Sequence, residues 1–327
     1  MTDITLSDEP LLTRDDSRFV MFPIKYPDIW EAYQNQVANF WRPEEIDLSK
    51  DIDDWEHKLT TDEKYYISMI LAFFAGSDGI VGENLAQRFM QDVQISEARA
   101  FYGFQLMMEN IHSHTYSLLI DTYIKDKDDK FKFLNGIQNF ECINLKAQWA
   151  KKWIEDVQSP FAARLVAFAC IEGIFFSGAF CSIFWLKKRG LMQGLSFSND
   201  LISRDEALHC EFAILLYSKL NNKLSQNIIN EIVTDAVNIE TNFICNALPC
   251  KLLGMNSELM SQYIQYVADR LLVQLGYAKL YNVTNPFDFM ELISLDSKVN
   301  MFERRVDAYA LADKTVCETT FDLDADF

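Results

Sequence analysis

Two copies of the pattern Glu-x-x-His are the residues whose types and spacing best suit chemistry in this chain. Glu109 and His112 form the first pair, and Glu206 and His209 form the second. Residues three apart lie on one face of an α-helix, so each pair directs a carboxylate and an imidazole toward one point. Such ligands suit iron or manganese that reacts with oxygen, whereas structural zinc prefers thiolates in a closed tetrahedron. The two pairs therefore predict a metal site.

Two further acids lie in apolar segments that precede the two pairs. Asp78 follows Phe73 and Phe74, and Glu172 lies between Ile171 and Gly173. An ionised carboxylate in such surroundings is costly unless a metal, a cation or a hydrogen-bond donor compensates it. One Glu-x-x-His is more often a solvated pair on a helix surface, but two copies with two spaced acids match the ligand order of ferritin-like dimetal bundles. We predict an all-α, ferritin-like helical bundle with a dimetal-carboxylate site in its core.

The composition fits one large domain. The 327 residues are 49% hydrophobic and include only 11 Gly and 7 Pro, without a linker-like run or a repeat of solenoid period. The net charge of −18 disfavours nucleic acid or an anionic membrane as a partner. Seven cysteines without a Cys-x-x-Cys pair, and an N-terminus unlike a signal peptide, predict a cytoplasmic location.

The segment from Leu165 to Leu186 is long and apolar enough to cross a membrane, and Glu172 is its only charged residue. Small and polar positions within the segment, and the preceding Ser159 and Pro160, favour a helix buried at the centre of a bundle instead. A lone glutamate in lipid would also lack the partners that a four-helix metal site supplies. We expect no membrane span.

Capping signals and apolar periodicity predict the helices that position these residues. The expected helices are residues 27–40, a long helix capped by Thr60 that carries Asp78, a helix from Ser96 through Tyr116, a helix that ends at Trp153, a helix from Pro160 to about Gly190, a helix that begins at Ser198, and residues 226–248, 257–275 and 299–309. The charged stretch from Lys125 to Lys132 is interpreted as a turn. The last dozen or so residues are acidic and are predicted to be disordered.

The two halves of the predicted site differ in one respect. Tyr116 stands seven residues after Glu109, whereas an alanine stands seven residues after Glu206. Seven residues are nearly two helical turns, so Tyr116 shares the face of the first ligand pair. From spacing alone, packing with a hydrogen bond is the commoner role of such a tyrosine, and a redox role is the alternative. Phe176 and Phe180 would cover a reactive species, although alone they are equally ordinary core residues.

Longer motifs resemble the small subunit of class I ribonucleotide reductase, in the form found in eukaryotes and their large DNA viruses. The resemblance spans nearly the whole chain. It rests on Arg18-Phe19-Val20-Met21-Phe22-Pro23-Ile24, Phe40-Trp41, Asp47-Leu48-Ser49-Lys50-Asp51, Met108-Glu109-Asn110-Ile111-His112-Ser113, Gly173-Ile174-Phe175-Phe176-Ser177-Gly178, Ser203-Arg204-Asp205-Glu206, Asn285-Pro286-Phe287-Asp288-Phe289-Met290 and Asp322-Leu323-Asp324-Ala325-Asp326-Phe327.

The resemblance implies an oxo-bridged pair of iron ions that reacts with oxygen and oxidises Tyr116 to a stable tyrosyl radical. Manganese or a mixed manganese and iron pair is the less expected loading. Phe176 and Phe180 would form the pocket of the radical. The implied metal ligands are Asp78, Glu109, His112, Glu172, Glu206 and His209.

The resemblance also implies that the radical passes reversibly through Trp41 and Tyr309 to a large catalytic subunit. That subunit reduces ribonucleoside diphosphates to deoxyribonucleotides. Asp205 would link Trp41 to His112 by hydrogen bonds that orient the imidazole. Without the resemblance, a surface carboxylate is the more ordinary interpretation of Asp205.

The same family pattern divides the chain into three parts. Residues 1–18 would be a flexible N-terminal segment, residues 19–311 the di-iron domain, and residues 312–327 an acidic tail. The tail would dock on the large subunit with Phe321 and Phe327 as apolar anchors, or, as the alternative, only promote solubility. The resemblance also implies that the small subunit forms a homodimer and binds no nucleotide itself, which agrees with the lack of a visible Gly-rich phosphate loop.

Two departures from the family pattern leave the implied ligands intact. One residue is inserted around residues 58–61, and His114 stands where an acid is expected. Among other classes, a di-iron oxygenase or desaturase would need a substrate cavity beside the metals, a ferritin-like storage protein would be shorter, and a scaffold subunit without a radical would lack ligands. All six ligands and Tyr116 are present, which favours the active reductase subunit.

Overall fold

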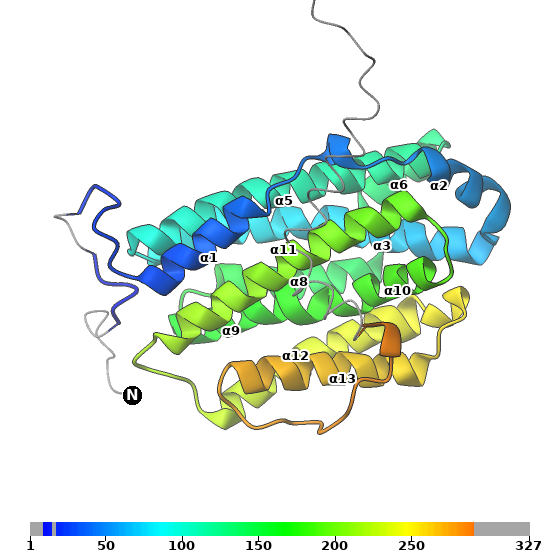
Figure 1. Ribbon diagram of the computed structural model, residues 1–327. Helices are drawn as coiled ribbons and strands as arrows, with labels where there is room; N and C mark the ends of the chain where they lie inside the picture. Colours follow the sequence, from blue (N-terminus) through cyan, green and yellow to red (C-terminus); the bar gives the residue numbers. More distant parts are fainter. Residues whose placement is uncertain (1–8, 15–17, 291–327) are drawn as a thin grey trace, which may run out of the picture. The chain divides into compact units, whose positions relative to one another are not determined.

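Four long helical segments form the centre of the structure and carry every predicted metal ligand (Figure 1). The computed structural model describes residues 9–14 and 18–290, which contain helices and no β-strand. The described residues up to Phe287 form one unit. The central segments are α3 (Thr61–Asn84), α5 (Ser96–Tyr123), α9 (Phe161–Cys170) with the π-helical turn η5 (Ile171–Phe175) and α10 (Ser177–Lys188), and α11 (Gln193–Ser218). The predicted all-α bundle is therefore confirmed.

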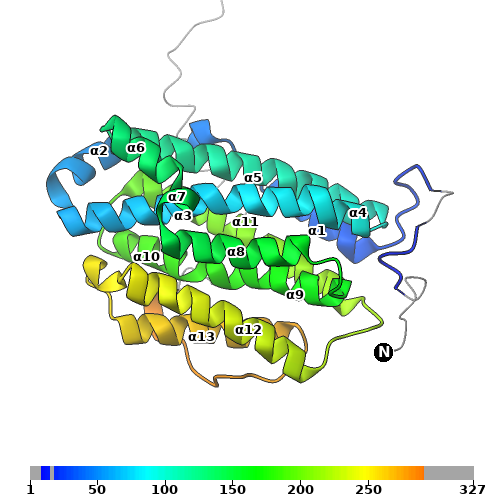
Figure 2. The same cartoon turned by 180° about the vertical axis from the view of Figure 1, so that it is seen from behind.

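Further helices surround this centre. Helix α1 (Pro27–Ala38) packs on α5 and α11, and α12 (Gln226–Thr241) packs beside α13 (Ser257–Gln274) and α9. From behind, α8 (Glu141–Glu155) lies between α3 and α9 (Figure 2). The short elements are η2 (Pro43–Glu45), α2 (Ser49–Asp53), η3 (Asp54–Lys58), η4 (Leu85–Phe89), α4 (Met90–Asp92), α6 (Lys127–Leu134), α7 (Gly136–Asn139), η6 (Asn242–Ala247) and η7 (Cys250–Leu253).

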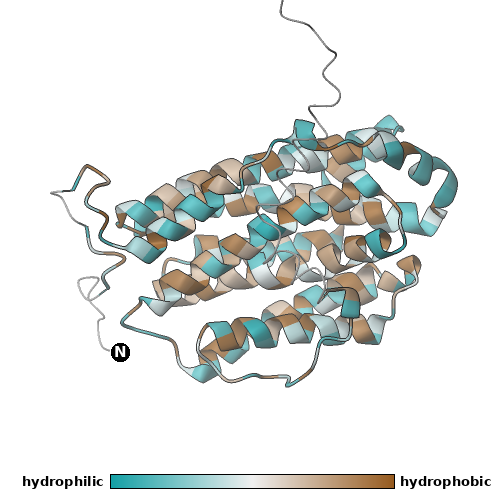
Figure 3. Ribbon diagram, viewed as in Figure 1, coloured by the Kyte–Doolittle hydropathy of each residue, from teal (hydrophilic) through white to brown (hydrophobic). Residues whose placement is uncertain are grey.

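Helix burial accounts for the apolar segment that resembled a membrane span. The stretch Phe161–Lys188 meets the length and hydropathy criteria for a span, and 94% of its most apolar window is buried inside the protein. A second stretch, Thr61–Asp92, also meets these criteria, with 61% of its window buried, although the sequence pattern did not single it out. The outer helices show hydrophilic and hydrophobic residues in alternation, as expected for helices with one solvated face (Figure 3).

The capping box predicted at the start of α3 is present. The side chain of Thr60 accepts a hydrogen bond from the Glu63 N–H at 3.2 Å, and the Glu63 carboxylate accepts one from the Thr60 N–H at 2.8 Å. Arg189 also contacts the Glu63 carboxylate at 2.6 Å. The box therefore fixes the start of the helix that carries Asp78.

The prediction that the last ligand helix begins at Ser198 was wrong. Helix α11 begins at Gln193, and Ser198 lies buried within it. The carboxylate of Asp51 accepts hydrogen bonds from the N–H groups of Gly194 and Leu195, at 2.8 and 2.7 Å. A distant acid thus accepts hydrogen bonds from N–H groups in the first turn of the helix, and no local capping residue is needed.

The charged stretch from Lys125 to Lys132 is also helical over most of its length. The side chain of Asp126 accepts hydrogen bonds from the N–H groups of Asp128 and Asp129, both at 3.0 Å, and so caps α6. An Asp before a helix satisfies its first N–H groups, which explains why a charged sequence forms a helix here. Only the residues just before the cap form the turn.

Some sequence predictions concern residues that lie outside the described part of the chain. The helix expected at 299–309 and the tail 312–327 lie outside the described residues, as do residues 1–8.

His114 is exposed on α5, on a different face from His112. The π-helical turn η3 ends at Lys58, next to the predicted insertion at 58–61.

We expect Thr60→Ala to lower the free energy of unfolding by about 1 kcal/mol, because the Glu63 N–H loses its acceptor. Urea or guanidinium unfolding followed by circular dichroism measures the change. Thr61→Ala is the matched control, since Thr61 is exposed in the first turn of the same helix and should change stability little. Equal effects of the two substitutions would contradict the capping role.

Candidate metal centre

Six side chains predicted as metal ligands converge on one buried site between the central helices. Ligand atoms of one group lie within 4.8 Å of one another, and the same holds for a second group. Glu109 belongs to both groups, so the two form one continuous centre. The first group is Glu109, Glu172, Glu206 and His209, and the second is Asp78, Glu109 and His112.

Glu109 and Glu206 lie between the two imidazoles. The Nδ1 atom of His209 is 3.2 Å from Glu109 Oε1 and 3.1 Å from Glu206 Oε2. The Nδ1 atom of His112 is 3.1 Å from Glu206 Oε1 and 3.5 Å from Glu109 Oε2. Each of these carboxylates therefore places one oxygen near each histidine, so both would be available to hold metal ions together with the imidazoles.

The site's electrostatics favour added positive charge. Burial and the neighbouring Glu109 raise the pKa of Asp78 well above its usual value. Burial and the Glu206 charge do the same to the pKa of Glu172. Burial alone would also raise the pKa of Glu206, but hydrogen bonds from His112 and His209 outweigh burial and lower this pKa.

Histidine protonation offsets part of the remaining negative charge in the absence of metal. Burial lowers the pKa of His209, but the charge of Glu109 and hydrogen bonds to Glu109 and Glu206 outweigh it and raise the value to about 9. The oxygens Asp78 Oδ2 and Glu172 Oε2 are buried without a hydrogen-bond partner. Unpartnered carboxylate oxygens facing imidazoles are the donor set that iron or manganese accepts, so the residues fit a dimetal site.

The amide of Gln105 supports two of the carboxylates. Its Nε2 atom donates to Glu172 Oε1 at 3.1 Å and to Glu109 Oε1 at 3.3 Å. The sequence predictions missed this residue. The spacing could have indicated Gln105, because it stands four residues before Glu109 and so shares its helix face.

Asp205 lies between Trp41 and His112. Its Oδ2 atom accepts a hydrogen bond from Trp41 Nε1 at 2.7 Å and lies 3.1 Å from His112 Nε2. The indole also stacks on the imidazole, with ring centroids 5.9 Å apart. All three side chains are buried. The structure thus brings together three residues from distant segments, as the family pattern implied.

Tyr116 is buried beside the centre in an aromatic cluster. Its ring stacks on Phe74 at 4.6 Å, and the Phe74 ring lies 5.8 Å from Phe176 and 5.1 Å from Phe180. Burial, and next to it the charge of Asp78, raise the pKa of the Tyr116 phenol well above its usual value. The sequence predictions included Phe176 and Phe180 but missed Phe74, which directly covers the tyrosine ring and lies four residues before Asp78.

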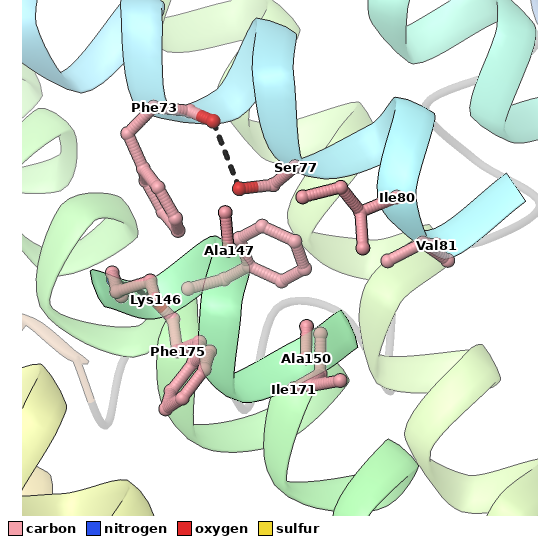
Figure 4. A pocket seen from close by; sticks show the side chains of 10 residues that line it. Phe73, Ser77, Ile80, Val81, Lys146, Ala147, Ala150, Ile171 and Phe175 are labelled. Carbon is pink, nitrogen blue, oxygen red and sulfur yellow. Dashed lines mark hydrogen bonds between the residues drawn. The ribbon is translucent and has the colours of Figure 1, made fainter. Parts of the chain in front are cut away.

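The cavity behind the ligand helices is too small for an organic substrate. Its volume is about 10 Å³, and its lining includes Ser77 and Ile171, the neighbours of Asp78 and Glu172 (Figure 4). That volume holds about one water molecule, whereas ligand pockets measure roughly 300–1,000 Å³. This cavity therefore gives no support to an oxygenase or a desaturase.

A helical bundle with four carboxylates and two imidazoles around one buried centre defines a ferritin-like dimetal-carboxylate protein. The family model described as "Ribonucleotide reductase, small chain" matches residues 18–286. The chain therefore belongs to this family, and it is a small subunit of ribonucleoside-diphosphate reductase.

Relatives from a plant, a virus and a yeast agree with this assignment. The chain is 61% identical to the ribonucleoside-diphosphate reductase small chain of Nicotiana tabacum, over 94% of this chain and 93% of that protein. It is 58% identical to the small chain of vaccinia virus (strain Ankara), over 98% of this chain and 100% of that protein. The solved structure of the Saccharomyces cerevisiae ribonucleotide reductase Rnr4 homodimer is 42% identical, with a TM-score of 0.81 and 93% of each chain covered.

In metal-free protein at pH 7, we expect Glu206→Gln to cost on the order of 3 kcal/mol of stability, because an ionised carboxylate that pairs with two imidazoles is lost. Glu172→Gln should cost less than about 1 kcal/mol, because the pKa of Glu172 is raised and Gln resembles the protonated acid. Denaturant unfolding in the presence of a chelator compares the two. Equal losses would show that this assignment of charges is wrong.

Proposed function

We propose that Tyr116 is the residue that this subunit oxidises to a radical, and that two iron ions drive the oxidation. The observation that carries the proposal is the complete set of six ligand-type side chains around one buried centre, with Tyr116 on the helix of one ligand pair. The proposed ligands are Asp78, Glu109, His112, Glu172, Glu206 and His209. When bound, the two ferrous ions supply two of the four electrons that reduce oxygen to water.

The protein would supply a third electron from Tyr116. Burial keeps the phenol protonated, since the pKa of Tyr116 is raised well above its usual value. Oxidation to a neutral radical therefore removes an electron and a proton together, and the charge of Asp78 is, after burial, the largest cause of the raised pKa of the phenol. Phe74 covers the Tyr116 ring, and Phe176 and Phe180 pack against Phe74, so this apolar cluster would keep water from the ring and prolong the life of the radical.

Trp41 is the proposed entry for the fourth electron and the first step of radical transfer. Its indole N–H donates to Asp205, and the same carboxylate oxygen faces His112, so two short contacts join the indole to a proposed metal ligand. Asp205 would hold the imidazole of His112 in one orientation. Tyr309, the proposed next carrier, lies outside the described residues.

The proposed partner is the large catalytic subunit, to which family membership points. The tail 312–327, with Phe321 and Phe327 as apolar anchors, would bind it, and residues 19–311 would form the di-iron domain. We also propose a homodimer, because the yeast Rnr4 structure, 42% identical to this chain, is a homodimer. The cytoplasm is the proposed location.

The test of this function is an electron paramagnetic resonance spectrum after ferrous iron and oxygen are added to metal-free protein. We expect a tyrosyl signal in the parent protein and none in Tyr116→Phe, which keeps the ring packing but removes the phenol. Bound iron should stay the same. Tyr102→Phe is the matched control, because Tyr102 is also buried on α5. A tyrosyl signal that survives in Tyr116→Phe would assign the radical elsewhere.

Trp41→Phe should lower deoxyribonucleotide formation with a large subunit by about 10- to 100-fold, since the Asp205 carboxylate loses its indole donor. Turnover assays measure this loss, and metal analysis should show two ions per subunit as in the parent. Trp153→Phe is the control, because the Trp153 Nε1 has no hydrogen-bond partner within the described structure. Unchanged turnover in Trp41→Phe would exclude Trp41 from the route.

A further inference from the structure

A buried ion pair lies behind η5 and takes no part in the proposed chemistry. Lys146 on α8 is 2% exposed, Glu240 on α12 is fully buried, and the ammonium contacts the carboxylate. Burial lowers the pKa of Lys146 to about 8 despite the nearby Glu240 charge. Apolar residues of similar volume often stabilise a core as well as such a pair does. Stability alone therefore does not explain why two charges stand here.

The pair binds the backbone on both sides of the junction between η5 and α10. The Lys146 Nζ donates to the carbonyl oxygen of Phe175, the last residue of η5, at 2.7 Å. The Glu240 Oε1 accepts from the N–H of Gly178, in the first turn of α10, at 3.1 Å. N–H groups in the first turn of a helix have no acceptor within it, so the carboxylate satisfies one of them.

The surroundings leave both charged groups little freedom. The Lys146 Nζ lies over the rings of Phe73 and Phe243, at 3.6 and 4.1 Å from their centroids, as cation–π contacts require. Figure 4 shows the lysine between α3 and η5. A Cβ at Gly178 would lie 2.6 Å from Glu240 Oε1, so only glycine lets the carboxylate approach this closely.

The junction that the pair holds connects directly to the metal centre. Glu172 lies on η5, three residues before the carbonyl that Lys146 binds. Phe176, at the junction itself, contacts Phe74, which stacks on Tyr116. A π-helical turn departs from the regular helical register, and such turns occur often at functional sites. Anchors on both sides would therefore set where the Glu172 carboxylate and the Phe176 ring lie.

We infer that Lys146 and Glu240 are positioning residues that fix the π-helical turn so that Glu172 reaches its metal ion. The inference rests on the proposed role of Glu172 as a ligand. Neither residue contacts the centre, and both act through the backbone of Phe175 and Gly178.

Two independent changes test the inference in the full-length, metal-free protein. The double variant Lys146→Met with Glu240→Gln removes the ammonium donor, keeps an amide oxygen for Gly178, and leaves no unpaired buried charge. Gly178→Ala displaces the carboxylate of Glu240 from the other side. Gly103→Ala is the control, because a Cβ there meets nothing within 4 Å.

The measurement is a titration with Mn²⁺, with free Mn²⁺ followed by electron paramagnetic resonance, and with thermal unfolding in a chelator recorded alongside. The parent and the control should bind two ions per subunit. In both test variants, one ion should bind about 10-fold or more weakly. The other ion should keep its affinity, and in the double variant the unfolding temperature in chelator should stay that of the parent. In Gly178→Ala the new Cβ also comes within 3.0 Å of Ile244, so a lower unfolding temperature is expected there from crowding.

Three results would overturn the inference. The first is parent-like affinity for both ions in the two test variants. The second is an equal weakening of both ions together with a lower unfolding temperature, which indicates general destabilisation. The third is a parent protein that itself binds fewer than two ions, which refutes the proposed dimetal function before any variant is considered.

Discussion

The structure depends on holding four carboxylates close together inside an apolar helical core. Such a cluster is unfavourable unless cations compensate it. Two imidazoles do so in part, because Glu109 and Glu206 each face both histidines. The raised pKa values of Asp78 and Glu172 show that compensation is incomplete in the absence of metal. Bound metal ions would complete it, and the bundle keeps the six side chains in place for them.

Buried acids outside the centre serve the same purpose by holding helix ends. Asp51 caps the first turn of α11, the helix of Glu206. Glu240, paired with Lys146, binds the first turn of α10 next to η5. Each acid accepts hydrogen bonds from N–H groups that have no acceptor within their own helix. Hydrogen bonds between distant residues thus hold the start of α11 and the junction between η5 and α10.

The two ends of the centre differ chemically although their ligands are similar. Beside the first pair, Tyr116 stacks on Phe74, which provides an oxidisable ring in an apolar wall. Beside the second pair, Phe101 stacks on Phe212 at 3.6 Å and meets His209 edge-on, and Tyr102 lies edge-on to Phe212 at 5.2 Å. In the proposed function, Tyr116 is the ring that is oxidised, and the oxidation is directed to the side of the first ligand pair.

The sequence by itself identified the six side chains that converge in the core, the all-helical class and the start of α3, because these depend on spacing within a helix and on local capping. It also carried the motifs that indicated the family, and the comparisons confirmed the family. Only the tertiary structure decided the start of α11, the cover of Phe74 over Tyr116, and the contact of Lys146 with Glu240. These depend on residues far apart in the chain, and local patterns carry no signal for which buried groups will meet once the helices pack.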